Sequence, residues 1–148
     1  MQDRFTRGFL AGLFTGVIIN IIDYIAFILN LTDTRYVDIA ARLVYGTRSH
    51  NLFEFIFAYL AQLAFSAFLG VIYSYLLIKI TSENHLLKGW LFGVAVWFFT
   101  FAIIVMFRVP GISQAHSPTA FTNAVLASIF GITLTQTLAF LDRRYANE

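Results

Sequence analysis

The 148-residue sequence contains no cysteine and few charged residues. The lack of cysteine excludes disulfides, thiolate metal sites, cysteine nucleophiles and a lipid-modified N-terminal cysteine. Charged residues make up 12% of the chain, about half of their share in soluble domains, whereas 59% of the residues are hydrophobic and 18% aromatic. The formal net charge of +2 is small and dispersed, which argues against a nucleic-acid-binding surface. The composition predicts a single domain that sits in lipid.

Four apolar runs are long enough to cross a hydrocarbon core, which takes about 20 helical residues. They cover residues 9–29, 53–78, 89–107 and 119–141. Backbone polar groups in lipid must be satisfied within their own element, so each run is predicted to be a helix. The first run follows Arg4 and Arg7 but is longer than the apolar core of a signal peptide, and we expect it to be retained. The predicted fold class is all-α, an integral membrane four-helix bundle formed by residues 1–148 as one domain.

The segment "TRYVDIAARLVYG" lies between the first and second spans. It places Val37, Ala40, Ala41 and Val44 at helical spacing, with more polar residues between them. The segment is too short to cross a bilayer and is strongly periodic. These features predict a short helix lying at the membrane interface, with a simple loop as the alternative.

The distribution of lysine and arginine between the short loops predicts the orientation. The side of the N-terminus holds six of these residues and the opposite side four. The excess favours a cell-membrane protein with both termini in the cytoplasm and the interfacial helix on the outer side.

Small residues recur at four-residue intervals along the spans. In the first span they share a stripe with Asn20 and Asp23, because each helical residue turns the chain by about 100°. Such stripes allow two helices to approach closely. The predicted helix-packing glycines are Gly8, Gly12, Gly16, Gly70, Gly89, Gly93 and Gly131.

Polar residues collect toward the outer ends of the spans. The candidate polar or ion site consists of Asp23, Asn20, Gln62, Asn123, Arg108 and Glu54. Because the small faces of the first and fourth spans can meet antiparallel, we expect Asn123 to hydrogen-bond Asp23, with Arg108 as counter-ion. An intramembrane carboxylate indicates either a site for a cation or proton, or a buried structural pair that fixes helix register.

The sequence contains no recognisable catalytic or cofactor motif. His50 and Glu54 are spaced at i,i+4, but no HExxH or other metal-ligand pattern accompanies them. A nucleophile-elbow pattern and a phosphate-binding loop are also lacking. We therefore expect no enzymatic activity, no metal and no cofactor.

Several apolar motifs occur together: a glycine-rich first span, "YIAFILNLT" at its outer end, "GWLFGVAVW" at the start of the third span, and a proline shortly after that span. In these motifs the chain resembles the small YqhR-like membrane proteins of spore-forming bacteria. The family is uncharacterised, so the resemblance implies a bacterial membrane protein and no particular activity or site.

Taken together, these features predict a small, non-enzymatic multi-spanning membrane protein that contacts membrane lipid. It is expected to form a homo-oligomer, or to join a larger membrane complex as an accessory subunit, through its glycine-rich and aromatic faces. Two alternatives stay open. The first is a small transporter or channel subunit for a cation or proton that uses Asp23 and its polar neighbours. The second is a protein that binds lipid in an outer-leaflet cleft.

Overall fold

The computed structural model describes residues 3–80, 83–109, 111 and 117–146, and over these residues the chain forms helices and no strand. The helices are α1 (Arg4–Ile28), α2 (Tyr36–Tyr45), α3 (Leu52–Lys79), α4 (His85–Met106) and α5 (Ser117–Ala146). Four of them, α1, α3, α4 and α5, are long and apolar enough to cross a membrane. The predicted all-helical fold with four spans is confirmed, and the observed bounds differ from the predicted ones by a few residues.

The predicted short helix between the first two spans is present as α2, so a simple loop is excluded. Asp38 lies in its first turn and Arg42 in its last, where each charge complements the helix dipole. The helix ends at Gly46, whose φ of 75° lies in the left-handed region. A glycine adopts this conformation without steric cost, which explains why the helix stops there.

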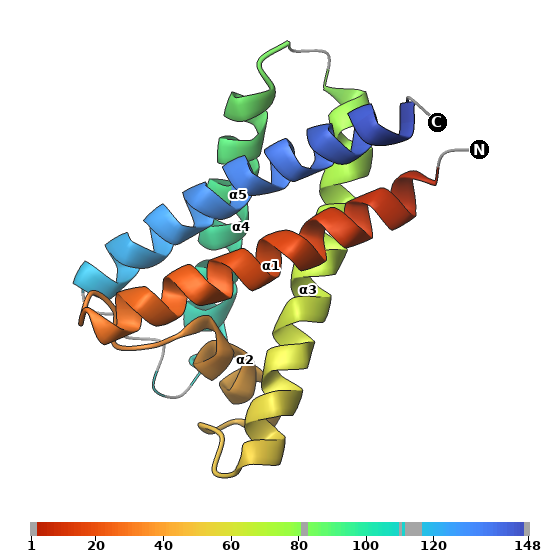
Figure 1. Cartoon of the computed structure of the whole chain (residues 1–148). Coiled ribbons are helices and arrows are strands. Elements are labelled where there is room, and N and C mark those ends of the chain that lie inside the picture. Colours follow the sequence, from red (N-terminus) through yellow and green to blue (C-terminus); the bar gives the residue numbers. More distant parts are fainter. Residues whose placement is uncertain (1–2, 81–82, 110, 112–116, 147–148) are drawn as a thin grey trace.

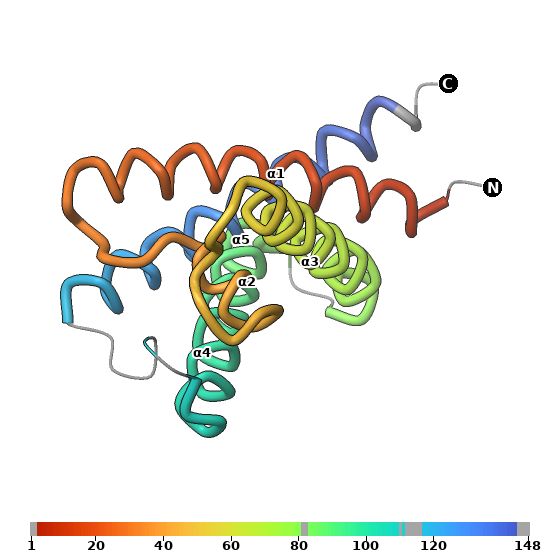
Figure 2. The backbone as a smooth tube through the Cα atoms, turned by 90° about the horizontal axis from the view of Figure 1, so that it is seen from below, coloured from red at the N-terminus to blue at the C-terminus, as the bar shows by residue number. Residues whose placement is uncertain are grey.

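The helices are arranged as a central pair with one helix crossing each member (Figure 1). The central pair is α1 and α5, which run antiparallel; α3 packs against α1, and α4 packs against α5. Seen from below, α3 and α4 lie on the same side of the central pair, with α2 between them (Figure 2). Both chain ends lie at one end of the bundle, called here the terminal end, and α2 lies toward the other, called the α2 end.

The main core forms where the spans meet. Its buried residues are Ala11, Ile19, Leu69, Tyr73, Phe130, Leu134 and Leu138. Two smaller clusters attach α2, one joining Val37 to Ala58 of α3 and the other joining Ile39 to Ile104 of α4. Large apolar side chains such as Phe53 remain exposed, as expected for surfaces that contact lipid.

Candidate functional site

The glycines of α1 lie where its backbone meets α3. A Cβ atom built on Gly8 would lie 2.8 Å from the carbonyl oxygen of Gly70 and 2.7 Å from Ser74 Oγ, and one on Gly16 would lie 2.8 Å from Ser66 Cβ. Gly12 and Gly70 also face backbone atoms of the opposite helix at closer range than real Cβ atoms tolerate. The crossing of α1 and α3 therefore requires glycine at these positions.

A second glycine crossing joins α4 to α5. Gly89 faces Gly131 and Thr135, while Gly93 faces the carbonyl of Ala127. A Cβ atom on any of these three glycines would overlap backbone of the other helix. All seven glycines of the predicted set thus lie in contacts within this chain, and their faces are occupied without a second subunit.

Asp23 binds the start of α2 rather than another transmembrane side chain. Its side chain is buried, with 2% of the residue exposed. Oδ2 accepts a hydrogen bond of 2.7 Å from the backbone N–H of Tyr36, the first residue of α2. The first N–H groups of a helix have no partner within it, so Asp23 supplies an acceptor that α2 needs. Its other oxygen, Oδ1, is buried without a hydrogen-bond partner in the described part of the chain.

Asn123 and Asp23 are connected through Tyr36 and not directly. The Tyr36 hydroxyl donates to the backbone carbonyl of Asn123 at 3.2 Å. The side-chain atoms of Asn123 are buried and have no hydrogen-bond partner among the described residues. The expected hydrogen bond between Asn123 and Asp23 is therefore wrong: Asp23 bonds the backbone of Tyr36, and the side chain of Asn123 makes no bond to it. Burial also raises the pKa of the Tyr36 hydroxyl, which keeps it a neutral donor.

The predicted pairing of Asp23 with Arg108 is also wrong. Arg108 is exposed after the end of α4, and the ion pairs of the described residues are Arg7 with Asp142 and Arg35 with Asp38. The cation close to Asp23 is Arg35, whose pKa is raised chiefly by its hydrogen bonds to Asp38, with a further contribution from the charge of Asp23.

Arg35 holds the connection between α1 and α2 in place. Its Nε and an amino group donate to the two carboxylate oxygens of Asp38 at 3.0 and 3.1 Å. Its guanidinium carbon lies 5.0 Å from the ring centroid of Phe27 and 5.7 Å from that of Phe55, within the range of a cation–π contact. One side chain thus ties together α1, α2 and α3.

The other predicted polar residues lie in two separate places. Asn20 Nδ2 donates to Gln62 Oε1 at 2.6 Å, which links α1 to α3 inside the bundle. Glu54 instead makes local contacts at the start of α3, where its carboxylate accepts from the backbone N–H of His50 at 2.7 Å. The six candidates therefore do not form one site. Helical periodicity shows which face of a helix each residue lies on, but it does not show which residues of other helices that face contacts.

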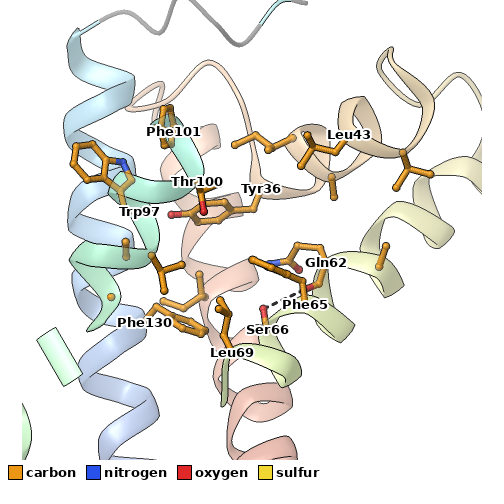
Figure 3. Close-up of a pocket in the computed structure, with 18 residues that line it drawn as sticks. Tyr36, Leu43, Gln62, Phe65, Ser66, Leu69, Trp97, Thr100, Phe101 and Phe130 are labelled. Atoms are coloured by element: carbon orange, nitrogen blue, oxygen red, sulfur yellow. Dashed lines mark hydrogen bonds between the residues drawn. The ribbon is translucent and has the colours of Figure 1, made fainter. Parts of the chain in front are cut away.

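The structure contains a cleft between α3 and α4 in the half of the bundle nearer α2 (Figure 3). Its volume is about 280 Å³, and it is floored by α1 and α5 and closed at one end by α2. The lining is mainly aliphatic and aromatic and consists of Ile19, Tyr36, Ile39, Ala40, Leu43, Val44, Ala61, Gln62, Phe65, Ser66, Leu69, Gly93, Val96, Trp97, Thr100, Phe101, Ala127 and Phe130. Gln62 is the member of the predicted polar set that lines it.

A few polar groups interrupt the apolar lining of the cleft. Ser66 Oγ donates to the backbone carbonyl of Gln62 at 3.1 Å (Figure 3), and Gln62 Oε1 accepts from Asn20 Nδ2. Trp97 Nε1 is buried and has no hydrogen-bond partner among the described residues. An apolar cleft with few polar groups is typical of a site for a mostly apolar molecule.

Neither a metal site nor a comparison with known proteins assigns a function to the described residues. Within the described ranges, no group of three or more histidine, cysteine or acidic side chains is placed to hold a metal ion. The chain matches no protein-family model, curated protein or solved structure in the comparisons made. The resemblance to the YqhR-like proteins stays a prediction.

Proposed function

We propose that this membrane protein binds the hydrocarbon portion of a lipid-like molecule in the cleft between α3 and α4. The observation that carries the proposal is the cleft itself, which residues of all five helices line. Its volume lies just below the range for ligand pockets, about 300–1,000 Å³. That size fits one chain of a lipid better than a whole lipid molecule.

The arrangement of the helices favours a guest that enters from the membrane. Helices α3 and α4 pack mainly against α1 and α5 rather than against each other. The space between them is therefore not filled by a helix–helix contact, and Phe65, Trp97 and Phe101 border it. These side chains provide dispersion contacts for an apolar chain.

We infer that the protein acts without catalysis, in the cell membrane, with its terminal end facing the cytoplasm. The excess of lysine and arginine at that end supports this orientation. The protein acts as a homo-oligomer or as an accessory subunit of a larger assembly. The exposed aromatic side chains of Phe98 and Phe99 on α4 support this part of the proposal, because they offer a contact surface. The glycine faces do not support such an assembly, because each is covered by another helix of the same chain.

Structural roles account for the polar residues that suggested a cation or proton pathway. Asp23 binds the N-terminus of α2, and Asn20 pairs with Gln62. Neither Asp23 nor Asn20 lines the cleft. Lipid binding is therefore favoured over transport.

Photocrosslinking with a phospholipid that carries a diazirine on its acyl chain tests the proposal. In the wild-type protein, labelled peptides should concentrate on the cleft-lining segments of α3 and α4. Ala61→Trp fills the cleft and should reduce this labelling several-fold. Ala64→Trp provides the matched control on α3, because Ala64 is exposed and does not line the cleft. Labelling that is spread evenly over the exposed faces and is unchanged in Ala61→Trp would exclude the proposed function.

A further inference from the structure

A second cavity lies at the terminal end of the bundle, away from the apolar cleft. Its volume is about 440 Å³. It is lined by Arg4, Arg7, Ser74, Leu77, Ile78, His85, Thr135, Leu138, Ala139, Asp142 and Arg143. Helices α1, α3, α4 and α5 all contribute, so the cavity lies between the ends of the four spans. Three arginines face one acidic side chain in this lining.

Among the described residues, the acidic side chain that lines the cavity is already neutralised. Asp142 forms an ion pair with Arg7, which connects α5 to α1. Arg7 is buried, with 8% of the residue exposed, and its Nε has no hydrogen-bond partner among the described residues. A buried positive charge is costly, so an anion in the cavity beside Arg7 would stabilise the guanidinium group.

Two arginines of the cavity remain uncompensated. Arg4 at the start of α1 and Arg143 near the end of α5 form no ion pair within the described portion of the chain. The guanidinium group presents several donors in a planar fork that matches the oxygens of a phosphate. Leu77 and Leu138 add apolar surface beside them.

We propose that this cavity binds the phosphate of an anionic phospholipid head group, with Arg4, Arg7 and Arg143 as its ligands. A lipid satisfies both halves of the lining, because its phosphate meets the arginines while its glycerol and first methylenes meet the leucines. Basic cavities between transmembrane helices are known to recognise anionic head groups. The apolar part of the lining favours a lipid over free phosphate, which would leave Leu77 and Leu138 facing water. This site is independent of the guest in the α3–α4 cleft.

Native mass spectrometry of the detergent-purified full chain, with phosphatidylglycerol or phosphatidylcholine added at equal concentration, tests this proposal. Wild-type protein should retain phosphatidylglycerol in preference to phosphatidylcholine. Arg143→Gln should lower that preference about fivefold, as expected for one basic contact to an anionic lipid. Arg144→Gln is the matched control: the residue is exposed, carries the same charge and does not line the cavity. It should leave the preference unchanged.

Each other outcome would overturn the proposal. Equal losses in Arg143→Gln and Arg144→Gln would show a general charge effect rather than a site. Equal retention of the two lipids by the wild-type protein would exclude head-group recognition. Displacement of phosphatidylglycerol by an equal concentration of inorganic phosphate would assign the cavity to free phosphate instead. Arg4→Gln, on another helix, should reproduce the effect of Arg143→Gln, which guards against a local change of fold in either variant.

Discussion

Replacement of Asp23 distinguishes a carboxylate that caps α2 from one that carries a cation or proton. Asp23 Oδ2 accepts from the backbone N–H of Tyr36, and Oδ1 has no partner among the described residues. Asp23→Asn retains an acceptor oxygen of the same reach, whereas Asp23→Ala leaves the N–H of Tyr36 without an acceptor in a buried position. If Asp23 caps α2, the two substitutions should therefore differ in their effect on the free energy of unfolding, although both remove the charge.

The expected magnitudes follow from the geometry. A buried donor that loses its acceptor costs about 1–3 kcal/mol, so Asp23→Ala should lower the free energy of unfolding by that amount. Asp23→Asn should change it by less than about 0.5 kcal/mol, since the hydrogen bond is kept and no cavity is created. In addition, Asp23→Ala should speed hydrogen exchange at the first turn of α2, where the Tyr36 amide would lose its partner.

Equilibrium unfolding of the purified protein in mixed micelles, followed by the loss of helical circular dichroism, measures the first quantity. Hydrogen exchange read by mass spectrometry over residues 33–45 measures the second. If Asp23→Asn were as damaging as Asp23→Ala, the negative charge rather than the acceptor oxygen would matter. That result would refute the capping role and restore the interpretation of Asp23 as part of an ion site.

Three further experiments test the packing and polar contacts of the bundle by the same unfolding assay. Gly131→Ala places a methyl group against backbone of α4 and should cost at least about 1–3 kcal/mol; a neutral result would contradict the close approach of the two helices. Tyr73→Phe removes a buried hydrogen bond to Thr135 of α5 and should lower the free energy of unfolding by about 0.5–1.5 kcal/mol. Tyr75→Phe, at an exposed site, should leave it unchanged, and equal effects of the two substitutions would argue against the bond. A double-mutant cycle of Arg7→Gln and Asp142→Asn should give a coupling energy of about 0.5–3 kcal/mol, and strict additivity would remove the ion pair.

The spans could be predicted from the sequence because hydropathy and length alone decide whether a helix is stable in lipid. The short helix α2 was predictable for a different reason, namely the spacing of Val37, Ala40 and Ala41 on one face. Helix ends were less accurate: α1 and α4 each end one residue before the predicted bound, and the C-cap residues Leu29 and Phe107 still donate to the carbonyls of Ile25 and Ile103.

The identity of the neighbours was not predictable from single helices. Periodicity places Asp23 on the small-residue stripe of α1 and gives its depth, but it does not tell which element covers that position. The residues 29–35 turn the chain back, so a backbone N–H of α2 reaches the carboxylate before any side chain of another span does. Arg108, expected at the outer edge of the third span as the counter-ion of Asp23, likewise lies exposed beyond the end of α4.

The α3–α4 cleft had no signal in the sequence. Trp97 and the following "FFTF" segment suggest a lipid-facing surface or a contact with a second protomer. Trp97 and Phe101 instead line the cleft, while Phe98 and Phe99 are exposed. A concave site of this kind depends on the angles at which α3 and α4 cross the central pair, which are set by the two glycine crossings together.

Fluorescence quenching by phospholipids brominated near the middle of the acyl chain tests most directly whether a lipid chain occupies this cleft. The protein contains two tryptophans, so Trp90→Phe leaves Trp97 as the reporter. If a lipid chain occupies the cleft, Trp97 should be strongly quenched, and most of that quenching should be lost when Ala61→Phe fills the cleft. Quenching of Trp97 that is weak in Trp90→Phe, or unchanged by the added Ala61→Phe substitution, would contradict this occupancy.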